Sequence, residues 1–219
     1  AKRFLSDARG TVEQDVSEYL QEEARLLPTR IEVDYFLADV DELRAWSAWL
    51  AQRSGRPPVL IGHSTGAIQV AALLERHPEL PLAAAVLVSP SCFDEELGPS
   101  GARLVHARAI HDLAQDADLP ARYSLSYCKT YTSLPAPLLS YLQWDTERVS
   151  DALLDVQVPL TVIYGDRDEH IDRAWVHRLG DAGVRLQLVP GANHFFDLAH
   201  DFDLLDGVIS VVSMVEHDE

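Results

Sequence analysis

The stretch Pro58-Val59-Leu60-Ile61-Gly62-His63-Ser64-Thr65-Gly66 decides the fold that this sequence predicts. An apolar run leads into Gly62, and Ser64 stands between two glycines, before a segment rich in Ala and Leu. A Gly-x-Ser-x-Gly pattern between a strand and a helix places the serine in a strained turn that exposes its hydroxyl. We expect both glycines to provide clearance around that turn, and the following helix N-terminus to stabilise negative charge there. We therefore predict Ser64 as a nucleophile and the backbone N–H of Thr65 as a donor to an oxyanion.

Short apolar segments alternate with amphipathic segments, which predicts an α/β fold with a mostly parallel sheet flanked by helices. The expected strands cover residues 58–61, 83–88, 160–164 and 184–189. We expect helices at 67–76, at about 203–215, and from Asp39, where Asp39 and Glu42 resemble a capping box. The residues expected to face inward on the Asp39 helix and on the last helix are Val40, Leu43, Trp46 and Leu50, and Leu204, Leu205, Val208, Ile209 and Val212.

The interval 91–157 differs from its surroundings because it has no strong parallel-strand pattern. It lies between two expected core strands, so we expect a helical cap or lid at 91–157, inserted into an α/β core formed by 1–90 and 158–219. Its apolar residues either line a pocket or form the small core of the cap. These residues are Tyr123, Leu125, Tyr127, Tyr131, Leu134, Leu138, Leu139, Tyr141, Leu142 and Trp144.

A serine hydroxyl is a weak nucleophile that needs a base, and the base needs a group to orient it. Asp168 follows the expected strand 160–164, and His194 follows the expected strand 184–189. The chain order Ser, Asp, His is the one found in triads built on such a sheet. We predict His194 as the base and Asp168 as its orienting carboxylate. The alternatives for the acid are Asp94, Asp166 and Asp172.

These elements resemble the α/β-hydrolase superfamily, in particular its serine esterases similar to lysophospholipases and monoacylglycerol lipases. The resemblance covers most of the chain and rests on Gly165-x-x-Asp168, Gly191-Ala192-Asn193-His194, Asp7-Ala8-Arg9-Gly10 and the segment 35–46. It implies hydrolysis of a carboxylic ester or thioester with an apolar acyl or alcohol group, through an acyl-enzyme and without a cofactor. The turn at Thr65 is also similar to that of cofactor-free haloperoxidases and perhydrolases, so perhydrolysis or acyl transfer by the same triad is an alternative.

One element of that superfamily has no counterpart before Ser64, namely the His-Gly pair that often marks the second oxyanion donor. If residues 2–6 form the strand before Asp7-Ala8-Arg9-Gly10, the oxyanion strand lies upstream of residue 1. Alternatively, 2–6 is the oxyanion strand and 31–36 the next one. We prefer the first arrangement, because Phe36 leads into the helix expected at Asp39 without a turn residue. Losing one donor costs roughly two to three orders of magnitude in turnover, so a non-catalytic ligand-binding or regulatory module is the alternative to an enzyme.

The net charge of −17 disfavours nucleic acids and anionic lipid surfaces as partners. We expect a small-molecule ester as the substrate and no stable membrane insertion, because the longest apolar run, 82–88, is too short to span a bilayer. The grouping of His194, Asp197, His200 and Asp201 fits the start of a helix better than a metal site. Cys92 and Cys128 are expected to be thiols in a reducing, cytoplasmic compartment, with a disulfide as the alternative. The sequence specifies no oligomeric state.

Overall fold

The structure, a computed structural model, describes residues 36–125, 128–197 and 200–217. For residues 94–100, 124–125, 128–131 and 216–217 it describes the backbone alone. The strands expected at 2–6 and 31–36 and the segment Asp7–Gly10 therefore lie outside the described residues, apart from Phe36, which begins a helix.

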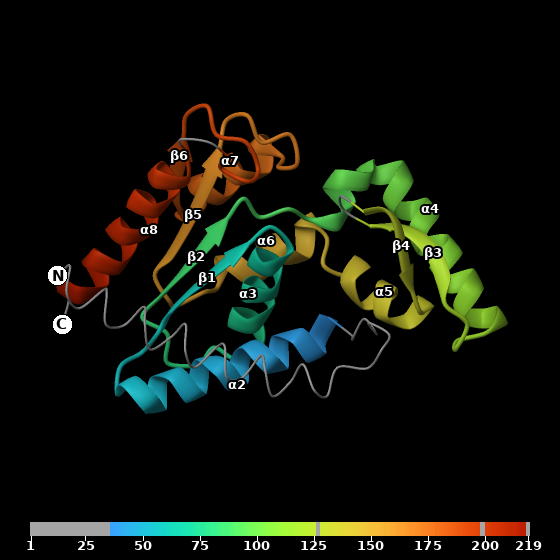
Figure 1. The fold of residues 1–219 in the computed structure, drawn as a ribbon, viewed down its shortest axis with the longest axis horizontal. Helices are drawn as coiled ribbons and strands as arrows, with labels where there is room; N and C mark the ends of the chain where they lie inside the picture. The colour runs from blue at the N-terminus through green and yellow to red at the C-terminus, as the bar shows by residue number, and fades with distance from the viewer. Residues whose placement is uncertain (1–35, 126–127, 198–199, 218–219) are drawn as a thin grey trace. The chain divides into compact units, whose positions relative to one another are not determined.

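A four-stranded parallel sheet forms the centre of the described chain, with the strand order β1-β2-β5-β6 (Figure 1). The strands are β1 (Val59–His63), β2 (Ala84–Val88), β5 (Leu160–Gly165) and β6 (Arg185–Val189). All four coincide with expected strands to within two residues. His63 pairs with Val88 in the register of β1 and β2, and Val88 pairs with Ile163 in that of β2 and β5. The carboxyl ends of these strands therefore meet at one edge of the sheet.

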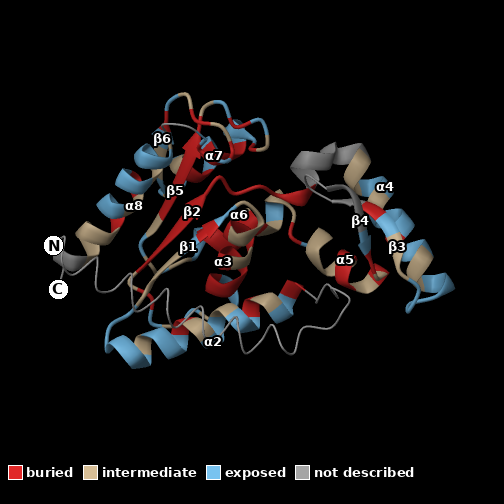
Figure 2. Cartoon of the chain, viewed as in Figure 1, coloured by how far each residue is buried: buried red, intermediate tan, exposed pale blue. Residues whose placement is uncertain are grey.

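Helices cover both faces of this sheet, which explains why its two central strands, β2 and β5, are almost entirely apolar. In β2 every residue is buried (Figure 2). Leu87 points into the larger apolar cluster, while Val86 points into a smaller one, as the alternation of side chains along a strand requires. The larger cluster includes residues of α2 (Phe36–Ser54), α3 (Thr65–Arg76), α6 (Thr146–Leu154) and α7 (Arg173–Asp181), and the smaller one includes residues of α8 (His200–His217).

The chain between β2 and β5 contains α4 (Phe93–Gln115), β3 (Ala121–Leu125), β4 (Cys128–Ser133) and α5 (Pro135–Leu142), followed by α6. The strands β3 and β4 pair antiparallel with each other, so the expectation of a helical cap is right for part of this interval only. Tyr123 and Leu138 are buried in a third apolar cluster together with Phe93 and Ala109. These side chains therefore fill the interior of this region instead of lining a pocket.

The first described helix, α2, begins at Phe36, three residues before the expected start. Asp39 consequently lies inside its first turn and does not act as a cap. Its carboxylate accepts hydrogen bonds from Gln69 Nε2 at 2.9 Å and from the Tyr141 hydroxyl. The expected capping box is therefore wrong, because α2 already includes Asp39, whose carboxylate accepts from two distant side chains instead.

The inward faces of α2 and α8 agree only in part with the expected ones: Val40 is buried and Leu43 packs against the larger cluster, and Leu204 and Val208 pack against the smaller one. On α2 the buried residues are Phe36, Val40 and Ser47, while Leu50 is 41% exposed. On α8, Val211 is buried, while Leu205 and Ile209 are 52% and 45% exposed. Both helices carry apolar residues on more than one face, so periodicity alone did not define which face packs against the rest of the fold. Among the described helices, none is long and apolar enough to cross a bilayer.

Candidate active site

Ser64 occupies the turn between β1 and α3, at the carboxyl edge of the sheet. Its backbone has φ 56° and ψ −123°, a conformation that costs a non-glycine residue about 1–3 kcal/mol. Two backbone hydrogen bonds hold this conformation: the Ser64 N–H donates to Val88 O, and the Ala67 N–H donates to Ser64 O, each at 3.0 Å. The strand, turn and helix predicted around Ser64 are thus present, with the strain that such a turn requires.

The two glycines that flank Ser64 differ in importance. A Cβ at Gly62 would lie 2.4 Å from Gly66 O, a contact that backbone cannot relieve without moving. A Cβ at Gly66 would meet nothing within 4 Å. The expectation that both glycines provide clearance is therefore right for Gly62 and wrong for Gly66, whose missing side chain would point into open space.

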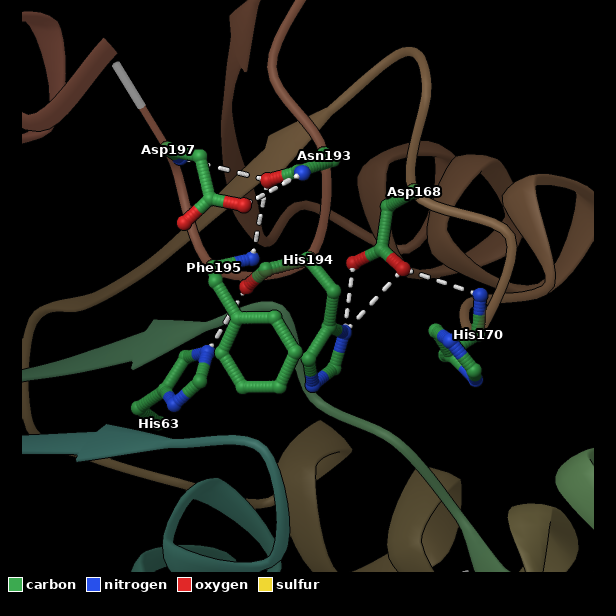
Figure 3. Close-up of polar contacts among 7 residues, drawn as sticks. All are labelled: His63, Asp168, His170, Asn193, His194, Phe195 and Asp197. Atoms are coloured by element: carbon green, nitrogen blue, oxygen red, sulfur yellow. Dashed lines mark hydrogen bonds and ion pairs between the residues drawn. The ribbon is translucent and has the colours of Figure 1, made fainter. Parts of the chain in front are cut away.

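Asp168 and His194 form a buried hydrogen-bonded pair at the same edge (Figure 3). His194 Nδ1 lies 3.0 Å from Oδ1 and 2.9 Å from Oδ2 of Asp168. The His194 side chain is 3% exposed, and the Asp168 side chain is 0% exposed. Because a carboxylate accepts, Nδ1 carries the proton and donates, which leaves Nε2 of the neutral ring as the basic nitrogen.

The environment of Asp168 keeps its carboxyl group ionised. Burial by itself raises the pKa of Asp168, but hydrogen bonds from His194 and from the His170 backbone N–H lower it, as do the nearby Ser89 hydroxyl and the positive charge that His194 carries when protonated. The pKa of Asp168 is therefore below its ordinary value of 3.8. The His170 N–H donates to Oδ1 at 2.9 Å. An ionised carboxylate in this position fixes the orientation of the imidazole and stabilises its protonated form.

Hydrogen bonds join the loop that carries Asp168 to the loop that carries His194. The Gly191 N–H donates to Asp166 Oδ1 at 2.6 Å, and the Arg167 N–H donates to Ala192 O at 2.9 Å. A Cβ at Gly165 would lie 2.1 Å from Ala192 O, so a side chain there would push the loops apart. The two loops therefore act as one rigid support for the pair.

Solved structures with the same architecture include a monoacylglycerol lipase of Paleococcus ferrophilus, with a TM-score of 0.62 and 18% identity over 87% of this chain and 79% of that one. A peroxisomal α/β-hydrolase of Saccharomyces cerevisiae gives 0.59 and 13% over 90% and 66%. A structure from a study of carboxylesterases of Nitrososphaera gargenis gives 0.55 and 19% over 87% and 76%. This chain has the α/β-hydrolase fold. The resemblance drawn from its motifs is thus confirmed at the level of the fold.

Two further comparisons gave a different result. Residues 1–56 match the family profile described as the C-terminal region of the ubiquinone biosynthesis accessory factor UbiJ, which covers about a quarter of the chain. No curated protein matches the sequence. The α/β-hydrolase assignment therefore rests on the architecture and on the residues at the sheet edge.

Within this α/β-hydrolase fold, the alternative acids have other functions or are not described. Asp166 holds Gly191, as noted above, and Asp172 caps α7 by accepting from the Ala174 N–H at 2.8 Å. Asp94 lies on α4, and its side chain is outside the described part. Among the acids with described side chains, Asp168 is the one bonded to the His194 ring.

His63 directly precedes Ser64 and contacts the loop that carries His194. Its side chain is exposed, and its Nε2 lies 2.8 Å from the backbone oxygen of His194, to which it donates (Figure 3). The His63 ring centroid is 5.0 Å from that of His194, and those of His170 and Phe195 are each 5.2 Å from it. Three rings thus surround the imidazole, and His63 connects the strand before Ser64 to the loop of His194.

The turn that presents His194 is held by its neighbour Asn193. Asn193 Oδ1 accepts from the N–H groups of Phe195 and Asp197, and Asn193 Nδ2 donates to Asp197 Oδ2 at 2.9 Å. His200, in turn, contacts Asp203 through Nδ1. Among the described side chains, no group of three or more His, Cys, Asp or Glu is arranged to hold a metal ion.

Cys92, the described one of the two cysteine side chains, is buried directly before α4. The Cys128 side chain is outside the described part. Sequence reasoning did not find the contributions of Ser89, His63 and the His170 N–H. These contacts join segments far apart in the chain or use backbone groups, and neither leaves a pattern in the sequence.

Proposed function

We propose that this protein is a serine hydrolase that cleaves a carboxylic ester or thioester through an acyl-enzyme. The observation that carries the proposal is the buried Asp168–His194 pair, which lies at the sheet edge where Ser64 occupies a strained turn. His63 supports the assignment, because it precedes Ser64 and its side chain contacts the backbone of His194. The proposal therefore rests on the arrangement of these residues and on the α/β-hydrolase fold.

In the proposed reaction, Ser64 Oγ attacks the carbonyl carbon while His194 Nε2 accepts the hydroxyl proton. The negative oxygen of the tetrahedral intermediate is stabilised by the Thr65 N–H, which lies at the N-terminus of α3. His194 then returns the proton to the departing alcohol or thiol. Water attacks the acyl-serine with His194 again acting as the base, which releases the acid and restores Ser64.

For the substrate, we propose a small ester with an apolar acyl or alcohol group, of the kind handled by lysophospholipase-like and monoacylglycerol-lipase-like enzymes. The region 91–157 would cover the site as a cap; because Tyr123 and Leu138 fill its own interior, the apolar group of the substrate rests on the resemblance to those enzymes. Tyr141 supports a fixed position for this region, because its hydroxyl bonds Asp39 of α2 and its ring packs edge-on against Phe36.

Hydrolysis of p-nitrophenyl esters of increasing acyl length, followed by absorbance, tests the proposal. We expect measurable turnover, and we expect Ser64→Ala to lower it at least about a thousandfold, since the nucleophile is lost. Ser54→Ala, at an exposed serine at the end of α2, is the matched control and should retain the full rate. Equal rates for Ser64→Ala and the wild type would reject Ser64 as the nucleophile.

Perhydrolysis or acyl transfer would use the same residues and is the second candidate, because it differs only in the acceptor of the acyl group. Adding hydrogen peroxide or a primary alcohol and analysing the products separates it from hydrolysis. A folded protein without turnover on any ester would favour the non-catalytic ligand-binding module.

A further inference from the structure

Ser89 is the first residue after β2, the strand between that of Ser64 and that of Asp168. Its N–H donates to Ile163 O of β5 at 2.8 Å, while Val88 O, directly before it, accepts from the Ser64 N–H. Ser89 therefore lies between the two parts of the proposed site, and it takes no part in the proposed reaction.

Two features make a serine costly at this position. Its backbone φ is 42°, in the left-handed region that glycine adopts without strain. Its side chain is fully buried, and Oγ has no hydrogen-bond partner at bonding distance within the described chain. Alanine would avoid the burial of the hydroxyl, and glycine would avoid both costs. The presence of a serine here despite both costs indicates a use for its hydroxyl.

The carboxylate of Asp168 is the acceptor that this hydroxyl can reach. The Ser89 hydroxyl lies close enough to contribute to the low pKa of that carboxyl group. Oδ1 of Asp168 accepts from the His170 N–H and both oxygens face His194 Nδ1, so Oδ2 has capacity for one more donor.

We propose that Ser89 is a positioning residue for the acid, and that its hydroxyl donates a hydrogen bond to the Asp168 carboxylate. This bond would hold the carboxylate against the end of β2 and fix its plane toward His194. The inference deepens the proposed function, on which its catalytic importance rests. The hydrogen bond itself can be measured without any turnover.

The direct test is a ¹³C NMR titration of the Asp168 carboxyl carbon, assigned with Asp168→Asn. We expect a higher titration midpoint in Ser89→Ala than in the wild type, because the anion has lost a donor. Ser89→Gly removes the strain of the positive φ and serves as the second variant in case Ser89→Ala folds poorly. It should show the same upward shift of the titration midpoint. Ser89→Thr retains the hydroxyl and should titrate like the wild type. Ser133→Ala, which removes another buried hydroxyl, is the control and should not move the midpoint.

The catalytic consequence is tested by the pH dependence of Ser64 labelling with a fluorophosphonate. In Ser89→Ala we expect labelling at neutral pH to be roughly tenfold slower, as for loss of a hydrogen bond to a charged group. We also expect the acid limb of the profile to move to higher pH, because the hydroxyl dipole no longer opposes positive charge on His194.

The outcomes separate the two proposals. Unchanged Asp168 midpoints in both Ser89→Ala and Ser89→Gly would overturn the assignment of Ser89, whatever the activity. A wild-type protein that resists labelling, while its Asp168 midpoint still responds to Ser89→Ala, would overturn the proposed function and leave the hydrogen bond established.

Discussion

The turn at Ser64 depends on the absence of a side chain at Gly62, because that position faces the backbone of Gly66. We predict that Gly62→Ala destabilises the protein by about 3 kcal/mol, since the 2.4 Å contact involves backbone atoms and forces β1 and α3 apart. Urea unfolding followed by circular dichroism gives the change in the free energy of unfolding.

Gly66→Ala is the matched control, on the second residue of α3. Its Cβ would enter open space, and alanine favours a helix over glycine by up to about 1 kcal/mol. We therefore expect this variant to be as stable as the wild type or slightly more so. A loss of stability from Gly66→Ala as large as that from Gly62→Ala would contradict the geometry described for the turn.

At the scale of the elements, the strands were predictable, and the helix faces were predictable only in part. The segments 58–61 and 160–164 are short, continuously apolar and followed by Gly, so strand was the one structure that fitted them. The helices α2 and α8 carry apolar residues around much of their surface. Leu50 and Ile209 fit a helical period as well as the residues that are buried, and only the packing partners distinguish them, which are α3 and α5 for α2 and the sheet for α8.

The candidate site was predictable to the extent that it depends on the order of elements. Asp168 and His194 each follow a strand, and the parallel sheet brings the ends of those strands to one edge. The contact of His63 with His194 spans 131 residues, and that of Asp39 with Tyr141 spans 102. Such contacts depend on how distant loops pack, so no local sequence pattern predicts them.

At the scale of the whole molecule, the low pKa of Asp168 makes folding stability depend on pH. A carboxyl group whose pKa is lower in the folded than in the unfolded state contributes stability above its unfolded pKa, and this contribution is lost as the pH falls through its folded pKa. For Asp168 the loss therefore occurs below its ordinary value of 3.8.

We predict that the difference in the free energy of unfolding between the wild type and Asp168→Asn is largest near neutral pH and becomes smaller below pH 3.8. Unfolding by urea at several pH values measures it, and comparison with the variant cancels the contribution of the other carboxyl groups. Glu79 also has a lowered pKa but is fully exposed, so Glu79→Gln should show a much smaller effect. A difference for Asp168→Asn that does not change with pH would contradict the ionised, hydrogen-bonded state of Asp168.

The central claim is that Ser64 is a nucleophile activated by His194 and Asp168. The most direct measurement is fluorophosphonate labelling of the folded protein at neutral pH, with the modified peptide located by mass spectrometry. We predict one label on Ser64, labelling abolished in Ser64→Ala, and a labelling rate lowered by at least about a hundredfold in His194→Gln. A folded wild-type protein that stays unlabelled, or one labelled equally in Ser64→Ala, would contradict this claim.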